Sequence, residues 1–274
     1  MKIAFIGGGN MAAALIAGLA GKVTPGANIH VVDPNAQALE RLQREHGVTT
    51  AGAIDAAVTQ GEVIVLAVKP QNMRDVTAVL QPLLAATSHQ PLVVSIAAGI
   101  RARDLARWLG GYDAIVRCMP NTPALIGMGV TGMVAHDGVT AGQRTLADQV
   151  LQAVGTTLWL DDEALIDAVT AVSGSGPAYV FYFIEAMQQA GVELGLTAEQ
   201  SLALAQATFT GAAQLAARSE EPVAVLRERV TSKGGTTHAA LSSMEQGGVK
   251  AAIVTAVKAA AARGKELGDE LGAQ

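Results

Sequence analysis

The sequence predicts an α/β fold in which a doubly wound parallel sheet is followed by an all-helical domain. Short apolar runs alternate with helix-period segments through the first 160 residues, and past Leu160 strand patterns stop while helix starts continue. Repeated strand–helix units of this kind build parallel sheets through right-handed crossovers. We therefore predict two domains, residues 1–160 for the sheet and residues 161–274 for the helices. A chain of 274 residues is long enough for both.

The composition limits the functional classes. The chain is 50% hydrophobic with a formal net charge of -5, and no basic run with interleaved aromatics is present, which argues against nucleic-acid binding. The single cysteine, Cys118, excludes an intrachain disulfide and fits a reducing compartment. The most apolar late segment, Ala251–Ala262, is too short to span a bilayer and is interrupted by Lys258. We expect a soluble, cytoplasmic protein with no membrane partner and no metal site.

The first strand leads into a glycine-rich turn. Ile3–Ile6 is a short apolar run, and Met11–Leu19 has helical spacing. Gly7 and Gly9 lie between these two segments, and Ala12 lies at the start of the second. Together they match the Gly-x-Gly-x-x-Gly/Ala pattern of dinucleotide-binding Rossmann domains. The glycines allow a tight turn and a close approach of the pyrophosphate. A purely structural turn is the alternative interpretation, but the position between strand and helix favours the cofactor site.

The second strand, Ile29–Val32, ends in Asp33, about 20 residues after the glycine motif, where an acidic residue accepts hydrogen bonds from the adenosine ribose. A carboxylate here repels a 2′-phosphate, and no Lys or Arg follows before Arg41, so the residues favour NADH. Asn35 or a distant cation could still hold a 2′-phosphate. Alternatively, Asp33 only caps the helix expected over Ala36–His46.

Three further strands are nearly continuous apolar runs, as strands buried on both faces are: Glu62–Ala67, Leu92–Ile96 and Ala114–Cys118. A helix from about Gln71 to Leu84 connects the first two. Ligands of such sheets bind at the carboxyl ends of the strands. The segments expected at that edge are Gly7–Met11, Ala67–Pro70, Ala97–Gly99 and Pro120–Thr122.

The second half carries helix signals only. Asp161 and Asp162 precede a helix start at Ala164, and Thr197–Gln200 forms a capping box. The segments Leu202–Ala217 and Val249–Ala262 are rich in alanine, whose small side chain lets helices approach closely. We predict that these helices form a dimer interface; the alternative is that they complete the domain's own core.

Two glycine-rich segments in this half precede helices. Ser173–Tyr179 reads Ser-Gly-Ser-Gly-Pro-Ala-Tyr, with Pro177 expected at the first helical position. Val230–His238 reads Val-Thr-Ser-Lys-Gly-Gly-Thr-Thr-His. Free N–H groups at a helix start bind carboxylates and phosphates, so each segment is predicted to bind an anionic group of a substrate. Simple capping is the alternative for the second segment, although it carries more hydroxyls than a cap needs.

These segments and their order resemble the pyrroline-5-carboxylate reductase family, which catalyses the last step of proline synthesis. The resemblance covers essentially the whole chain. It rests on the Gly7–Ala12 opening, Ala67-Val-Lys-Pro70, Met119-Pro-Asn-Thr-Pro123, Ser173–Tyr179 and Thr231–Thr237. It implies a Rossmann domain followed by a helical domain that intertwines with a partner subunit. The implied assembly is a homodimer, with dimers joined into decamers in the family.

The resemblance also implies a set of site residues. With Asp33, the cofactor contacts are Ile6, Gly7, Gly8, Gly9, Asn10, Met11, Ala67, Val68, Lys69, Pro70, Ala97, Ala98 and Gly99, and Asn121 lies near the nicotinamide. The substrate carboxylate is held by Ser173, Gly174, Ser175, Gly176, Gly234, Gly235 and Thr236, and Thr237 hydrogen-bonds the ring nitrogen.

The cofactor that the resemblance implies is NADPH or NADH. Members of the family often prefer NADPH and many accept NADH, whereas Asp33 favours NADH. One departure from the family pattern is Ile54, where an Asn is common, and this puts one ribose contact in doubt.

The chemistry implied is reduction of the cyclic imine 1-pyrroline-5-carboxylate to L-proline, which requires orientation and a hydrogen-bond partner for nitrogen rather than a strong acid or base. The roles of Lys233, His238 and Glu220 stay open, with Lys233 interpreted as a solvated loop charge. A 3-hydroxyacid dehydrogenase of similar architecture is one alternative, but the helix after Pro177 has no Lys or His through Leu196 to act as base. The other is a catalytically silent dinucleotide-binding regulator, which intact substrate segments disfavour.

Overall fold

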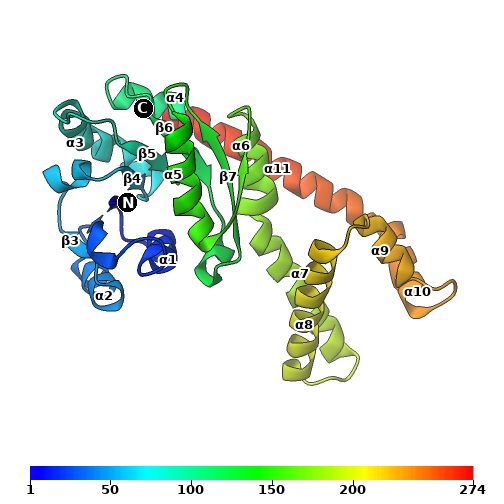
Figure 1. The fold of residues 1–274 in the computed structure, drawn as a ribbon. Coiled ribbons are helices and arrows are strands. Elements are labelled where there is room, and N and C mark those ends of the chain that lie inside the picture. Colours follow the sequence, from blue (N-terminus) through cyan, green and yellow to red (C-terminus); the bar gives the residue numbers. More distant parts are fainter. Residues whose placement is uncertain (274) are drawn as a thin grey trace. The chain divides into compact units, whose positions relative to one another are not determined.

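The computed structural model describes residues 1–273 and confirms the α/β fold class (Figure 1). One eight-stranded sheet has the order β3-β2-β1-β4-β5-β6-β7-β8. Its strands are β1 (Ile3–Ile6), β2 (Ile29–Val32), β3 (Thr49–Ala51), β4 (Val63–Leu66), β5 (Leu92–Ser95), β6 (Ile115–Met119), β7 (Gly129–Ala135) and β8 (Gly155–Trp159).

The helices of the sheet region are α1 (Asn10–Leu19), α2 (Ala36–His46), α3 (Met73–Ala85), α4 (Ala102–Trp108) and α5 (Ala141–Leu151). Those that follow are α6 (Leu165–Val169), α7 (Gly176–Glu193), α8 (Ala198–Arg218), α9 (Val223–Arg229), α10 (Thr236–Gln246) and α11 (Val249–Gly272). Short 3-10 turns lie between these elements, among them η2 (Ala56–Gln60), η3 (Pro70–Asn72) and η4 (Thr122–Ile126).

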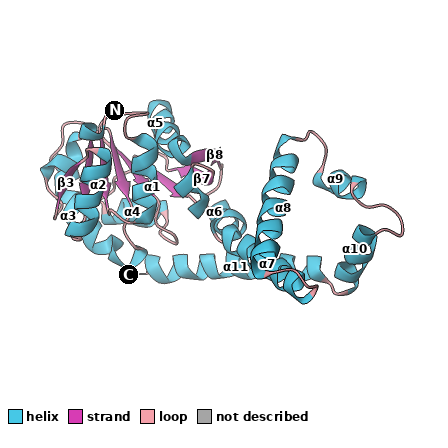
Figure 2. Cartoon of the chain, turned by 90° about the horizontal axis from the view of Figure 1, so that it is seen from below, coloured by secondary structure: helices cyan, strands magenta, loops and turns pink. Residues whose placement is uncertain are grey.

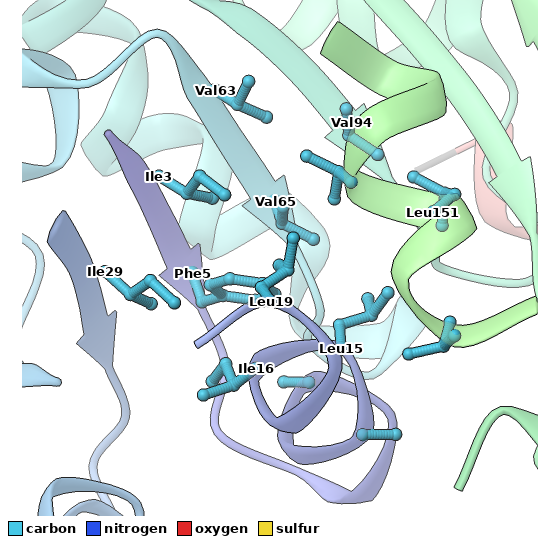
Figure 3. Packing of buried hydrophobic residues seen from close by; sticks show 14 of the residues in the cluster. Ile3, Phe5, Leu15, Ile16, Leu19, Ile29, Val63, Val65, Val94 and Leu151 are labelled. Atoms are coloured by element: carbon cyan, nitrogen blue, oxygen red, sulfur yellow. The ribbon is translucent and has the colours of Figure 1, made fainter. Parts of the chain in front are cut away.

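Helices cover both faces of the sheet, because alternate side chains of each strand point to opposite faces (Figure 2). Ile3 and Phe5 of β1 belong to a buried cluster with residues of α1, α2 and α5, and Figure 3 shows Phe5 beside Leu19. Ala4 and Ile6 belong to a second cluster with residues of α3 and α4. Each fully buried side chain of this size contributes about 1.5–3 kcal/mol, so β1 is anchored on both faces.

The sheet is not parallel throughout. Strand β7 runs antiparallel to β6, with Cys118 opposite Met133, and then pairs in parallel with β8. The connection over residues 120–128 is shorter than the dozen residues that a parallel crossover needs, so the chain turns back beside β6. The expectation of a wholly parallel sheet is therefore corrected at this strand. Strands β3, β7 and β8 were not predicted at all.

The described residues contain no strand after Trp159, where the predicted sheet domain was expected to end. By contacts, the chain forms two compact units: residues 1–174 together with the end of α11 from residue 260, and residues 175–259. The contact boundary thus falls later than residue 160, and the last turns of α11 belong with the sheet. The division into domains 1–160 and 161–274 stays a prediction.

Few side chains are buried in the unit of residues 175–259. Helices α7 and α10 contain no buried residue, and α8 contains only Ser201 and Ala205. Large apolar side chains are instead exposed on α7, among them Phe181 at 59% and Tyr182 at 72%. Among the described residues, no helix is both long and apolar enough to cross a membrane.

Candidate cofactor and substrate sites

Three adjacent strands bring the predicted cofactor segments to one edge of the sheet. Ile6 of β1 lies opposite Leu66 of β4, and Leu66 lies opposite Ser95 of β5. The segments Gly7–Met11, Ala67–Pro70 and Ala97–Gly99 therefore leave the sheet side by side. Strand β1 lies between β2 and β4, where the strand order reverses direction, and this switch point is where doubly wound sheets bind dinucleotides.

The glycine turn leaves a free helix start. Gly7 has a φ of 105°, and a Cβ added there would lie 2.5 Å from the carbonyl oxygen of Ala67, so only glycine fits. An added Cβ on Gly9 would meet no atom within 4 Å. Helix α1 begins at Asn10, and Gly9 supplies no side-chain cap, so the first N–H groups of α1 have no capping partner. These features fit the pyrophosphate of a dinucleotide.

Asp33 stands directly after β2, beside the glycine turn. Its Oδ2 accepts a hydrogen bond of 2.6 Å from the N–H of Gly8, and its Oδ1 accepts one of 2.8 Å from the N–H of Asn35. The cap of α2 is Asn35, whose side chain accepts from the N–H groups of Gln37 and Ala38. The alternative that Asp33 only caps this helix is therefore wrong.

The segments after β4 and β5 differ in exposure. Lys69 is exposed, and Pro70 opens the short 3-10 turn η3. Ala97 is buried and Ala98 is exposed. Gly99 has a φ of 78°, and its added Cβ would lie 3.1 Å from Cδ1 of Leu271, so the end of α11 packs against this turn. The sheet edge and the last turns of the chain are thus joined within one compact unit.

Asn121 is 9% exposed, and both the oxygen and the nitrogen of its amide form hydrogen bonds within the protein. Its Oδ1 accepts a 3.0 Å hydrogen bond from the N–H of Val130, and its Nδ2 donates a 3.2 Å hydrogen bond to the carbonyl of Ser173. Its position near the nicotinamide stays a prediction. What the structure adds is that Asn121 ties the sheet edge to the first glycine-rich substrate segment.

The start of that segment is itself helical. Residues Thr170–Gly174 form a π-helical turn directly after α6, and the Ser173 hydroxyl donates to the carbonyl of Val169. Helix α7 then begins at Gly176, one residue before the predicted Pro177, and Ser175 makes no capping hydrogen bond. π-turns recur at functional sites, and here one precedes a helix start without a side-chain cap.

A contact that the sequence did not reveal holds this π-turn. A Cβ added to Gly174 would lie 2.5 Å from Cε of Met119, so the methionine at the end of β6 packs where a side chain would stand. The only available signal was the position of Met119 at a strand end. Sequence patterns do not show which residue faces a glycine far along the chain.

The second predicted substrate segment precedes α10. Gly234 has a φ of 75°, and Gly235 occupies the cap position without a side chain to fill it. Thr236 is exposed and Thr237 is half-buried in the first turn of α10. In Figures 1 and 2 the starts of α7 and α10 lie at different ends of the unit of residues 175–259, so one chain does not bring them together.

The titratable side chains in or near these segments are not buried. Lys233, His238 and Glu220 are all exposed. Burial raises the pKa of the Cys118 thiol far above its usual value, which makes that side chain a poor nucleophile. The described residues contain no cluster of His, Cys, Asp and Glu that could hold a metal ion. The arrangement suits binding and orientation more than acid–base catalysis.

Comparison with known proteins identifies the family. A sequence model described as pyrroline-5-carboxylate reductase dimerisation matches residues 163–267, and one described as NADP oxidoreductase coenzyme F420-dependent matches residues 2–99. The pyrroline-5-carboxylate reductase of Pseudomonas aeruginosa is 49% identical over 99% of this chain and 98% of its own length. The chain belongs to the pyrroline-5-carboxylate reductase family. The reductase of Haemophilus influenzae is 41% identical over 97% of each chain.

Solved structures of pyrroline-5-carboxylate reductases agree with the fold. The structure from Coxiella burnetii superposes with a TM-score of 0.91 at 38% identity and covers 97% of this chain and 98% of that one. The Plasmodium falciparum enzyme, solved with NADP bound, has a TM-score of 0.85 at 30% identity, with 98% of both chains covered. A prephenate dehydrogenase from Aquifex aeolicus, at 13% identity and a TM-score of 0.53, shares the fold alone.

Proposed function

We propose that this chain reduces 1-pyrroline-5-carboxylate to L-proline with NADH or NADPH. The observation that carries the proposal is the match to a reductase at 49% identity over 99% of the chain. The segments that set this family apart from other dinucleotide-binding proteins, Ser173–Tyr179 and Thr231–Thr237, are intact.

The cofactor role falls to the sheet edge. The turn Gly7–Met11 presents the start of α1 to the pyrophosphate, and Asp33 accepts from the adenosine ribose. Ala67–Pro70 and Ala97–Gly99 line the same edge, with Asn121 toward the nicotinamide. When bound, the nicotinamide supplies the hydride that reduces the ring carbon.

The substrate role falls to the two helix starts. We assign the carboxylate to the N–H groups and hydroxyls of Ser173–Gly176 and Gly234–Thr236, because both segments precede helices that lack a side-chain cap. Since one chain does not bring these segments together, we propose that each comes from a different subunit of a homodimer. The positive ends of helix dipoles attract a carboxylate without a cationic side chain. Lys233, which is exposed, is therefore not required for this contact.

The reaction needs little beyond orientation. A protonated cyclic imine is already electrophilic, so the protein contributes by holding the ring carbon in place and keeping nitrogen hydrogen-bonded. Thr237, in the first turn of α10, is the residue assigned to that hydrogen bond. Its hydroxyl can accept from the protonated imine nitrogen and can donate to the amine of the product.

The test measures oxidation of NADH and of NADPH with 1-pyrroline-5-carboxylate. Thr237→Val, which removes the hydroxyl and keeps the shape, is expected to lower kcat at least tenfold and to leave cofactor binding unchanged. Thr145→Val on α5, an exposed threonine outside these segments, is the matched control and is expected to behave as wild type.

Each rival has its own outcome. No turnover with either nucleotide would support the silent regulator. Loss of all activity in Lys233→Met, together with oxidation of 3-hydroxyacids by the wild type, would support the dehydrogenase; helix α7 contains no Lys or His to serve as its base.

We further propose a homodimer. The match of residues 163–267 to the dimerisation model supports it, as does the exposure of large apolar side chains in a unit with almost no buried residue of its own. An apolar groove between α7 and α11, lined by Tyr182, Phe183 and Ile253, is a surface that a second copy can cover. A monomer mass by light scattering would contradict this.

Two finer assignments complete the proposal. Assembly of dimers into decamers follows from the family resemblance, and sedimentation of the purified protein tests it. A cytoplasmic location fits the single buried thiol of Cys118, and fractionation of cells producing the protein tests that.

A further inference from the structure

The carboxylate of Asp33 is held in place by the backbone on two sides. Its Oδ2 accepts from the N–H of Gly8 at 2.6 Å, and its Oδ1 accepts from the N–H of Asn35 at 2.8 Å. A Cβ added to Gly8 would lie 3.4 Å from the Cβ of Asp33, so the side chain packs against the glycine turn itself. The carboxylate therefore cannot swing away from a ribose without losing two charge-assisted hydrogen bonds.

The turn directly after Asp33 offers an added phosphate no cationic side chain. Pro34 has no N–H, and the N–H of Asn35 already donates to Asp33. The first Lys or Arg after Asp33 is Arg41, in the second turn of α2. Among the described residues, Asp33 forms no ion pair.

Lys69, the cationic residue of the segment after β4, lies on the side of β1 opposite to Asp33. Lys69 follows β4, and β2 and β4 flank β1 on opposite sides. Two strand spacings, about 10 Å, therefore separate the ends of β2 and β4. Lys69 is exposed beyond β4, so it is not placed to neutralise a phosphate next to Asp33.

We infer that Asp33 makes NADH the preferred reductant of this chain, an inference that rests on the proposed function. A ribose diol donates two hydrogen bonds to a fixed carboxylate. A 2′-phosphate, which carries close to two negative charges at neutral pH, donates none and is repelled. The Plasmodium falciparum relative was solved with NADP. The preference therefore belongs to the residues at the end of β2 in this chain rather than to the family as a whole.

The experiment measures two quantities for each nucleotide. One is kcat/KM with 1-pyrroline-5-carboxylate, and the other is the Kd of NADH and of NADPH for the full-length protein by calorimetric titration. We expect the wild type to favour NADH at least tenfold in both, which corresponds to about 1.4 kcal/mol.

The variants change the charge at and next to Asp33. Asp33→Ser removes the charge and is expected to improve NADPH binding at least tenfold while weakening NADH. Asp33→Ser combined with Pro34→Arg adds a cation at an exposed position and is expected to reverse the preference. Glu40→Gln, an equal charge change on an exposed residue of α2, is the control and is expected to leave the ratio unchanged. Circular dichroism checks that each variant is folded.

The outcomes separate the inference from the proposed function. Equal affinities in the wild type, or tighter NADPH, would overturn the inference, as would an Asp33→Ser ratio within threefold of wild type. Absence of imine reduction with both nucleotides would refute the proposed function, while the titrations would still decide the role of Asp33.

Discussion

Replacing Gly7 or Gly9 of the same turn by alanine is predicted to have two different effects, one on folding and one on cofactor binding. Gly7→Ala is expected to damage folding, and Gly9→Ala is expected to damage cofactor binding only. The contrast follows from what an added methyl group would meet. At Gly7 it would lie 2.5 Å from the Ala67 carbonyl oxygen, whereas at Gly9 no atom lies within 4 Å.

The magnitude at Gly7 has two parts. Its φ of 105° costs a residue with a side chain about 1–3 kcal/mol. The close contact is with backbone that cannot easily move, because the N–H of Ala67 donates to Ile6 at 2.8 Å and that of Gly7 donates to Val32 at 2.8 Å. Overpacking of this kind adds about 1–3 kcal/mol. We expect Gly7→Ala to lower the free energy of unfolding by about 2–6 kcal/mol.

At Gly9 we do not expect the free energy of unfolding to fall. Its φ of -70° and ψ of -176° suit alanine, so the free energy of unfolding is expected to stay constant or to rise by about 0.4–1 kcal/mol. The new methyl group would stand in front of the start of α1, where the pyrophosphate binds. The Kd for NADH is therefore expected to rise at least tenfold.

Urea unfolding followed by circular dichroism, at one protein concentration, measures the first effect. Calorimetric titration with NADH measures the second. A Gly7→Ala protein within about 1 kcal/mol of wild type would refute the steric argument. A Gly9→Ala protein that binds NADH as tightly as wild type would show that this turn does not seat the cofactor.

Three more predictions concern the sheet unit. Glu163→Gln leaves Arg117, which is 4% exposed, without its anion at 2.9 Å and is expected to cost about 3–5 kcal/mol in urea unfolding. Adding Arg117→Met should recover most of that loss, and a double variant weaker than Glu163→Gln would contradict it. Because burial raises the pKa of Cys118, its thiol is expected to resist thiol reagents in the folded protein. Its contribution to stability is full below about pH 8.5 and declines above that pH, where the unfolded thiol ionises; Cys118→Ala should remove this decline. Asn121→Asp loses the donor to the Ser173 carbonyl and is expected to raise KM for the imine more than the Kd for NADH, so equal changes would argue against a positioning role.

The predicted cofactor segments could be found from sequence because their physics is local. A run of apolar residues such as Val63–Leu66 needs burial on both faces, and a glycine turn between strand and helix has few other uses. Strands β3 and β7 were not predicted, because their own residues do not show such a local pattern. Strand β7 contains two glycines, and β3 has only three half-buried or exposed residues, so neither shows the pattern of a buried strand.

The alternation of strand and helix signals, the acidic end of β2 and the glycine-rich segments are properties of short stretches of chain, and the order of the residues alone determined them. The antiparallel return of β7, the π-turn at Thr170–Gly174 and the bond from Asn121 to Ser173 depend on partners far away in the sequence. Only packing in three dimensions could select them. A methionine that replaces the missing side chain of a distant glycine, as Met119 does at Gly174, satisfies a steric requirement that neither residue shows alone.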